Sequence, residues 1–168
     1  MTWNDPNWSR RETLASHDNY YYKLTGGGMT VVLPKDLAWE DEFSWEPVAQ
    51  VYEYSVEGNL LIQESTKKKG RHITLVGQNN MAWLDRQDML TLIQMKNIAG
   101  LKMQFTFEPK GSTSSYSLFS HTVMFRHQDT AIEYALVKNW DQYENDSLYI
   151  INAIRLMEVL PNQPTSGV

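Results

Sequence analysis

The histidines are the side chains of this sequence best suited to metal binding or acid–base chemistry. The chain has four of them and no cysteine, so thiolate nucleophiles, thiolate metal sites and disulfides are excluded. His127 and Asp129 are two residues apart, a spacing at which they could bind a metal or the carboxylate could orient the imidazole. No third ligand follows at a recognisable spacing, which favours a solvated strand end. His121 alternates with Phe119 and Val123, which indicates a core or interface position. The sequence therefore predicts no metal site.

Residues 39–46 combine carboxylates with aromatic rings. Two acids in one site are what a glycosidase needs, and Glu40, Asp41, Glu42 and Glu46 supply the residue type. These acids are interleaved with aromatic residues at positions 39, 43 and 45, a mixture more typical of a recognition or assembly surface. The segment is therefore expected to make contacts rather than to catalyse.

Two further patterns lack a catalytic signature. The serines at positions 112, 114 and 115 fall in a predicted hairpin loop, without the pattern of a nucleophile elbow. Gly26–Gly28 lacks the Lys-Ser/Thr ending of a phosphate-binding loop. Because no set of titratable side chains converges in the sequence, we expect no enzymatic activity and no cofactor.

A cluster of cations is the sharpest charge feature. Lys67, Lys68, Lys69 and Arg71 place four positive charges within five positions, although the formal net charge of the chain is -5. An acidic protein is a poor general binder of nucleic acid, because such binding depends on Lys and Arg meeting phosphates. We expect this loop at a boundary with an acidic neighbour, for which residues 40–46 are one candidate.

Composition indicates one globular domain with unusually many aromatic residues. The 168 residues are 42% hydrophobic and 21% charged, and they include 6 Trp and 9 Tyr. Such residues suit interfaces, although a β-rich core also uses them. No apolar run approaches the length of about 20 residues that spans a bilayer, and the first residues do not resemble a signal peptide. These features indicate folding in a cytoplasm.

Three zones follow along the chain. Residues 1–28 are polar and aromatic, lack sustained periodicity and end in three glycines, so they are interpreted as an N-terminal arm with a hinge at Gly26–Gly28. Residues 29–160 are patterned throughout and are predicted to form the core domain. Residues 161–168 are interpreted as a flexible C-terminal tail.

The pattern of the core domain is mainly β. Alternation over residues 48–56 and 60–64, with a Glu-Gly-Asn turn between them, predicts a hairpin. Further strands are predicted at 72–76, 101–107, 116–126, 131–137 and 148–159. One helix is predicted over about residues 85–98, with Asp85 as its N-cap. The expected fold is mainly β (α+β): an antiparallel β-sandwich or split barrel with one flanking helix.

Six short segments follow one another along the core domain: Leu33–Leu37 (LPKDL), Trp45–Gln50 (WEPVAQ), Gly70–Gly77 (GRHITLVG), Trp83–Arg86 (WLDR), Val123–His127 (VMFRH) and Ile154–Val159 (IRLMEV). In their order and spacing these segments resemble the distal tail, or baseplate, proteins of siphophages. The resemblance begins at Met29, so residues 1–28 have no counterpart in it.

The resemblance implies a structural virion protein of a long-tailed bacteriophage. It implies a tail-tube-like fold, a hexameric ring joining the tail tube to the tail tip or hub proteins, and a lumen through which DNA would pass without specific binding. It implies no membrane partner. Two alternatives stay open: a tail-completion or minor tail protein of the same fold, or a carbohydrate-binding β-sandwich with Trp39, Trp45 and Trp83 as its sugar platform. The residues proposed for the assembly interface are Trp3, Trp8, Tyr20, Tyr21, Tyr22, Trp39, Trp45, Lys67, Lys68, Lys69 and Arg71.

Overall fold

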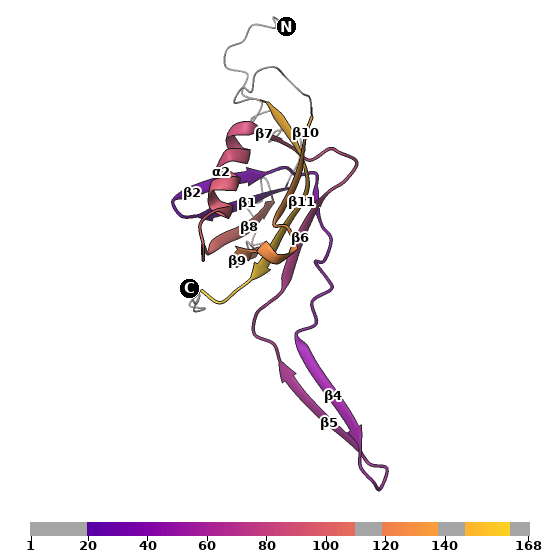
Figure 1. Cartoon of the computed structure of the whole chain (residues 1–168). Coiled ribbons are helices and arrows are strands. Elements are labelled where there is room, and N and C mark those ends of the chain that lie inside the picture. The colour runs from indigo at the N-terminus through magenta and orange to yellow at the C-terminus, as the bar shows by residue number, and fades with distance from the viewer. Residues whose placement is uncertain (1–19, 110–118, 138–146, 162–168) are drawn as a thin grey trace, which may run out of the picture.

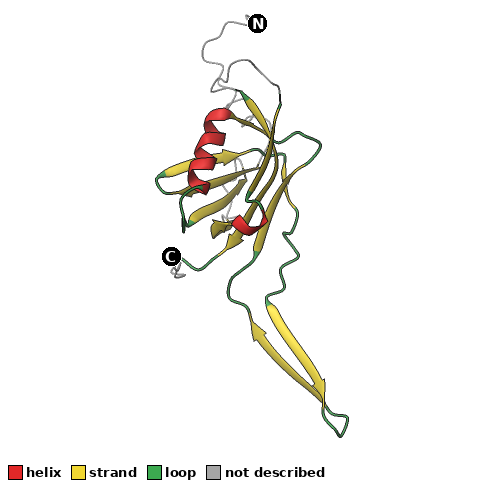
Figure 2. Cartoon of the chain, viewed as in Figure 1, coloured by secondary structure: helices red, strands yellow, loops and turns green. Residues whose placement is uncertain are grey.

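The computed structural model describes residues 20–109, 119–137 and 147–161. Antiparallel strands dominate, with one α-helix among the described residues (Figure 2). The elements are β1 (Tyr20–Gly26), β2 (Met29–Leu33), β3 (Leu37–Trp39), β4 (Val48–Tyr54), β5 (Leu60–Thr66), β6 (His72–Gly77), β7 (Trp83–Asp85), α2 (Arg86–Lys96), β8 (Met103–Pro109), β9 (Phe119–Phe125), the 3-10 turn η1 (His127–Asp129), β10 (Ile132–Leu136) and β11 (Leu148–Glu158).

The longest strand, β11, organises the main sheet. The strand order is β2-β1-β8-β9-β11-β6-β3, with every pair antiparallel (Figure 1). The second half of β11 pairs with β9 and β6, whereas its first half pairs with β10 and β7. The alternating buried pattern of β11 places one row of its side chains in the core.

The main sheet curls around its core as a partly open barrel. Trp39 at one end of the strand order meets Phe105 of β8 edge to face, with ring centroids 5.9 Å apart. Helix α2 covers the core with Met89, Leu92 and Met95. The largest fully buried side chains are Phe105, Leu24, Leu33, Ile73, Leu75, Leu92, Met95, Met103, Ile151, Ile154, Leu156 and Val31. Burial of this apolar set stabilises the body of the protein.

Several predictions from the sequence are confirmed. The fold is mainly β with an antiparallel sheet and a flanking helix. The hairpin pairs in register from Val48↔Thr66 to Tyr54↔Leu60. Asp85 caps helix α2, because its Oδ1 accepts the backbone N–H of Asp88 at 2.8 Å.

The predicted boundary of an arm at residue 28 is wrong. Tyr20–Gly26 form strand β1, which pairs with β2 on one side and with β8 on the other. Leu24 is completely buried in the core. The glycines are not a hinge between arm and core, because Gly27 and Gly28, with φ of 61° and 74°, make the tight turn of the β1–β2 hairpin. The remainder of the predicted arm, residues 1–19, lies outside the described residues.

The first residue of the C-terminal tail predicted at residues 161–168 is described by the structure. Pro161 is exposed, and its carbonyl accepts a hydrogen bond of 2.8 Å from Lys102 Nζ. The other residues of the predicted tail, 162–168, lie outside the described residues.

Strands β4 and β5 do not join the main sheet. They form a separate two-stranded sheet that projects from the body as an arm (Figure 1). Every position of both strands is exposed except Ala49, which is half-buried. The projecting hairpin is therefore the largest departure from a closed globular shape in the described part of the chain.

Candidate assembly surface

One face of the projecting hairpin is strongly apolar toward its tip. Residues opposite each other in an antiparallel pair share a face, so Tyr52 lies beside Ile62 and Tyr54 beside Leu60. The exposed fractions of the two tyrosines are 66% and 69%. Those of Leu60 and Ile62 are 48% and 53%. We call these four residues the tip patch.

The other face of the hairpin also carries exposed apolar side chains. Val51 and Leu61 point to it with exposed fractions of 60% and 55%, and Val56 at the turn is fully exposed. A two-stranded hairpin without a cover is only marginally stable by itself in water. A contiguous exposed apolar surface of this kind marks an interaction site.

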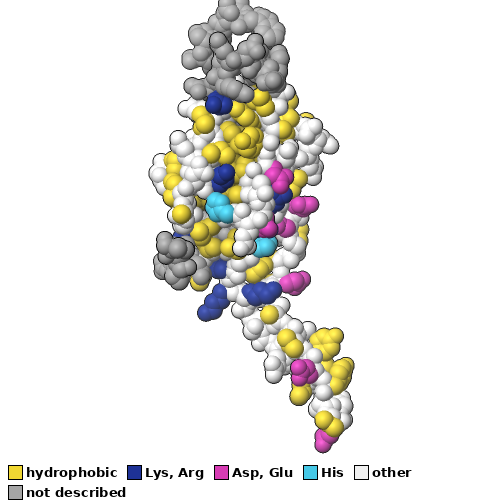
Figure 3. Space-filling view, viewed as in Figure 1, with side chains coloured by type: hydrophobic (Ala, Val, Ile, Leu, Met, Phe, Trp, Pro, Cys, Tyr) yellow, Lys and Arg dark blue, Asp and Glu magenta, His cyan; other side chains and the backbone are white. Residues whose placement is uncertain are grey.

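The charges along the hairpin have one sign. Between Val48 and Thr66 the chain has Glu53, Glu57 and Glu64 but no Lys or Arg. Glu64 accepts a hydrogen bond from Gln50 across the strands. The two acids nearer the turn, Glu53 and Glu57, extend into solvent, so the far end of the hairpin is apolar and negative (Figure 3).

An ion-paired cluster fastens the base of the hairpin to the body. Lys69 Nζ lies 2.6 Å from Glu158 Oε1, and His121 Nδ1 lies 3.0 Å from the same oxygen. The main chain ties the same point, because Gly70 N–H donates to the Glu158 carbonyl and Glu158 N–H donates to the Arg71 carbonyl. Burial would raise the pKa of Glu158, but the hydrogen bonds from Lys69 and His121 outweigh it and lower that pKa.

Arg71 also makes its contacts within its own chain. Its guanidinium lies over the ring of Trp39, with Cζ 4.6 Å from the ring centroid, and donates to the Glu42 carbonyl. Trp39 in turn meets Phe105 and His121 edge to face. Trp39 therefore packs within its own chain, and these contacts do not support its predicted role at an assembly interface. A ring covered by a guanidinium is also not a free platform for a sugar.

The acidic segment at residues 40–46 is partly structural. Asp41 accepts the backbone N–H of Thr74 at 2.7 Å and its hydroxyl at 2.8 Å, and it also accepts Trp39 Nε1 at 3.0 Å. These bonds anchor the loop that leads into β4. Phe43, by contrast, has an exposed fraction of 91%, so its ring is uncovered in the segment that precedes the hairpin.

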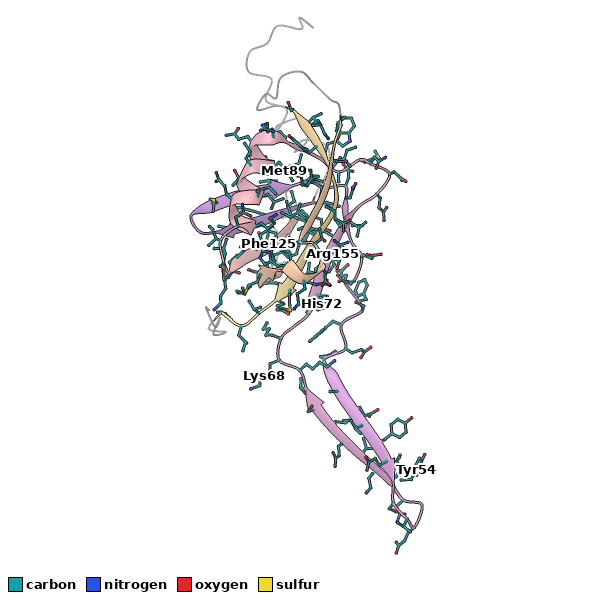
Figure 4. The ribbon with its side chains drawn as sticks, in the orientation of Figure 1. Tyr54, Lys68, His72, Met89, Phe125 and Arg155 are labelled. Carbon is teal, nitrogen blue, oxygen red and sulfur yellow. The ribbon has the colours of Figure 1, made fainter. Side chains whose placement is uncertain are left out.

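Only two of the four clustered cations are left for an outside partner. Lys67 Nζ lies 5.5 Å from the centroid of the half-buried Trp45 ring, and its side chain is exposed. Lys68 is exposed and has no ion pair with any residue in the described ranges; Figure 4 shows it where the hairpin joins the body. The cation cluster is therefore divided between an internal anchor, Lys69 and Arg71, and an exposed pair.

Aromatic residues near the N-terminus were also predicted to lie at the assembly interface. Trp3 and Trp8 lie outside the described residues. Tyr20 and Tyr21 belong to strand β1, where they pair with Pro109 and Glu108 of β8.

Tyr22 packs within the body rather than against a partner. Its ring stacks on Phe105 with centroids 5.6 Å apart and tilts against Phe107 at 5.2 Å. Burial raises the pKa of the Tyr22 hydroxyl, and the nearby Glu42 charge adds to the effect. Its predicted role at an assembly interface is replaced by a core contact.

The residues that sequence reasoning missed are those of the hairpin itself. Tyr52, Tyr54, Leu60 and Ile62 were expected only as strand residues. The sequence did contain a signal, because apolar residues occupy both faces of the alternating pattern. Tyr52, Tyr54, Leu60 and Ile62 lie on one face, and Val51 and Leu61 lie on the other. A strand that is apolar on both faces needs cover on both faces.

The residue patterns that could suggest catalysis do not come together in the fold. The Asp129 carboxylate is held by Arg126 through Nε at 2.9 Å and through Nη2, so it is not directed at His127. Within residues 20–109, 119–137 and 147–161 there is no group of three His, Cys, Asp or Glu side chains that could hold a metal. The serines at 112, 114 and 115 lie outside the described residues. No helix in the described ranges is both long and apolar enough to cross a membrane.

Comparison of the chain with protein-family models, curated proteins and solved structures found no match.

Proposed function

We propose that this protein is a structural subunit of a bacteriophage tail tip, of the distal tail type, which assembles into a ring between the tail tube and the tip or hub proteins. The observation that carries the proposal is the projecting hairpin, whose tip patch is exposed in a single chain. An arm with apolar side chains on both faces requires a partner to cover it. The kind of assembly, a ring at the tail tip, is inferred from the sequence segments that resemble distal tail proteins.

The anchoring of the hairpin supports an assembly role. The ion-paired cluster of Lys69, Glu158 and His121 and the main-chain bonds at Gly70 join the hairpin base to the centre of the sheet. Such an arm presents its apolar surface from a stiff base, which lowers the ordering cost when a partner binds. In this proposal the protein has no catalytic role and its partners are other tail proteins and further copies of itself.

The carbohydrate-binding alternative has less support. A sugar platform needs exposed aromatic faces, but Trp39 is covered by Arg71 and Trp45 is half-buried beside Lys67. Trp83, the third ring of that hypothesis, has an exposed fraction of 40%, and its Nε1 donates to the Asn80 carbonyl at 2.6 Å, so one exposed ring remains of the three.

Two measurements test the proposed function. Purified protein is examined by light scattering after size exclusion and by electron microscopy, where a closed ring is expected. Purified virions are then labelled with antibody against this chain, and label at the tail tip is expected. Absence of the chain from virions would overturn the proposal, whatever its mass in solution. Label at the head–tail junction would instead indicate a tail-completion protein.

A further inference from the structure

Two segments of the chain connect the hairpin to the body, and each is held by one carboxylate. Residues 40–47 lead into β4, and the Asp41 carboxylate bonds to Thr74 of β6. Residues 67–71 lead out of β5, and Glu158 of β11 holds them through Lys69. Among the described elements β4 and β5 pair only with each other, so these two segments set the direction in which the hairpin projects (Figure 1).

Glu158 serves two partners with one oxygen. Its Oε1 lies 2.6 Å from Lys69 Nζ and 3.0 Å from His121 Nδ1. Within residues 20–109, 119–137 and 147–161, no second carboxylate forms an ion pair with Lys69 or His121. The charge of this carboxyl group therefore decides whether both partners are balanced.

The other charged groups around Glu158 do not replace it. Arg71 accepts the Glu158 N–H through its carbonyl, and its guanidinium lies over the ring of Trp39. Glu42 receives that guanidinium through its main-chain carbonyl, and its charge acts on the Tyr22 hydroxyl. His72 pairs with the residue before Glu158, so its side chain lies on the opposite face of the sheet.

Protonation of Glu158 leaves positive charge without a partner. An imidazole is ordinarily charged at a pH where a carboxyl group takes up its proton. The Lys69 side chain is 37% exposed and can turn into water, but the His121 side chain is only 16% exposed. A nearly buried cation without its anion is strongly destabilising. Release of Lys69 opens a way for water to His121, because both side chains share one carboxylate oxygen.

We propose that Lys69, Glu158 and His121 form an acid-sensitive latch, which fixes the direction of the hairpin while Glu158 is charged and releases residues 67–71 when Glu158 is protonated. The body stays folded, because its core is apolar and does not titrate. The latch belongs to the single chain. As a control on assembly, the inference rests on the proposed function, since a released hairpin presents its tip patch at a higher ordering cost.

The latch is closed at neutral pH. Burial alone would raise the pKa of Glu158, but the hydrogen bonds and charges of Lys69 and His121 lower it from its ordinary value of 4.5. With a lowered pKa in the folded state, the stabilisation is present above the unfolded pKa and is lost as pH falls through the folded one. Release is therefore expected in acid, below pH 4.5.

Distances between spin labels test the latch in the full-length chain. The chain has no cysteine, so Gln63→Cys on β5 and Gln94→Cys on α2, both at exposed positions, introduce a single pair of labels. A narrow distribution of distances is expected at pH 7, and a clearly broader one below pH 4.

Glu158→Gln imitates the protonated carboxyl group at constant pH. In this variant the distribution is expected to be broad already at pH 7, with no further step in acid. The Gly70 amide, which donates to the Glu158 carbonyl, is expected to exchange with deuterium about tenfold faster. Amides around Leu75 and Ile154, in the centre of the β6–β11 pair, are expected to keep their protection.

Glu133→Gln is the matched control. It removes the carboxylate that pairs with Arg155 at 2.6 Å on the body and leaves both connections of the hairpin unchanged. It is expected to behave as the unaltered chain does at both pH values. Circular dichroism confirms that each protein is folded, and if Glu158→Gln does not fold, the acid titration of the unaltered chain is the deciding test.

The outcomes separate the latch from the proposed function. A distribution that stays narrow below pH 4 in a folded chain, or one that is already broad at pH 7, overturns the latch. Loss of protection at Leu75 and Ile154 in step with Gly70 also overturns it, because the body then unfolds as a whole. A chain at the tail tip whose hairpin ignores acid leaves the function standing without the latch. An acid-released hairpin in a chain missing from virions does the reverse.

Discussion

Lys69 Nζ and Glu158 Oε1 are 2.6 Å apart, which joins the segment that follows strand β5 to the last residue of strand β11. The two residues are 89 positions apart in the chain. Glu158 is 8% exposed, and its carboxylate also meets His121. A nearly buried carboxylate with two cationic or imidazole partners is a structural anchor, and the projecting arm depends on it.

Replacing the anchor carboxylate is expected to destabilise the body. Glu158→Gln removes charge-assisted bonds, and since the side chain of Lys69 is 37% exposed the expected loss is about 1–2 kcal/mol at pH 7. The pKa of Glu158 is lowered in the folded protein, so its stabilisation is present above the unfolded pKa and is lost as pH falls through the folded one. The difference in unfolding free energy between the unaltered protein and Glu158→Gln should therefore shrink below pH 4.5, the ordinary pKa of this carboxyl.

Urea unfolding at pH 7 and below pH 4 measures this difference. Lys68→Met is the matched control, because Lys68 has no ion pair with any residue in the described part of the chain, and it is expected to change stability by no more than about 0.5 kcal/mol. A stability difference for Glu158→Gln that stays constant with pH would show that the carboxylate is not held in its charged form.

Gly77 is expected to tolerate no side chain. A Cβ at this position would lie 1.9 Å from the Ile151 carbonyl oxygen and 3.1 Å from Ala82 Cβ, so the backbone of β6 or β11 would have to move. Gly77→Ala should cost about 3 kcal/mol or prevent folding. Gly28→Ala is the comparison: its φ is +74° but its Cβ would meet nothing within 4 Å, so only backbone strain of about 1 kcal/mol is expected. Thermal unfolding of both variants checks the order.

Removal of residues 1–28 is expected to unfold the protein, because it deletes strand β1 and exposes edges of both β2 and β8. The point variant Leu24→Ala tests the same dependence more gently and should cost 2–5 kcal/mol, about the usual range for a buried leucine. Soluble yield and the thermal midpoint are the measurements. A fully stable Δ1–28 protein would contradict the pairing of β1 with β8.

The tip patch is expected to matter for assembly but not for folding. Tyr52→Ser/Ile62→Ser removes a cross-strand apolar pair from an exposed face, so the thermal midpoint of the body should barely change while the mass in solution falls. Val32→Ser, at a residue of β2 with an exposed fraction of 48%, is the control on the body. Equal loss of assembly in both would show that general surface hydrophobicity, not the hairpin, drives association.

Local patterns were enough to predict many elements of this protein. The pattern at residues 48–56 and 60–64, with a glycine at the turn, predicted the hairpin, whose strands are Val48–Tyr54 and Leu60–Thr66, and Asp85 predicted the start of the helix. These features depend on neighbours in sequence, since side-chain periodicity and capping act over a few residues. The mainly β fold class followed from their sum.

Strand β1 could not be predicted in the same way. Tyr20–Gly26 is polar and aromatic and lacks clear alternation, and it becomes a strand because β2 and β8 bond to both of its edges. Tertiary pairing here overrides a weak local preference. Of the three glycines that suggested a hinge, Gly26 ends strand β1, and Gly27 and Gly28 form the turn that leads into β2.

The division of the cations was also decided by tertiary structure. In the sequence Lys67, Lys68, Lys69 and Arg71 form one charged run, and nothing local distinguishes them. Folding brings Glu158 to Lys69 from a distant strand and places Trp39 beneath Arg71, leaving the first two lysines exposed. The sequence by itself determined the charges, the turns and the alternation, because these are local. Two features were decided only by the tertiary structure: which of the cations pair within the chain, and the projection of the hairpin from the body. Both depend on contacts between residues far apart in the chain.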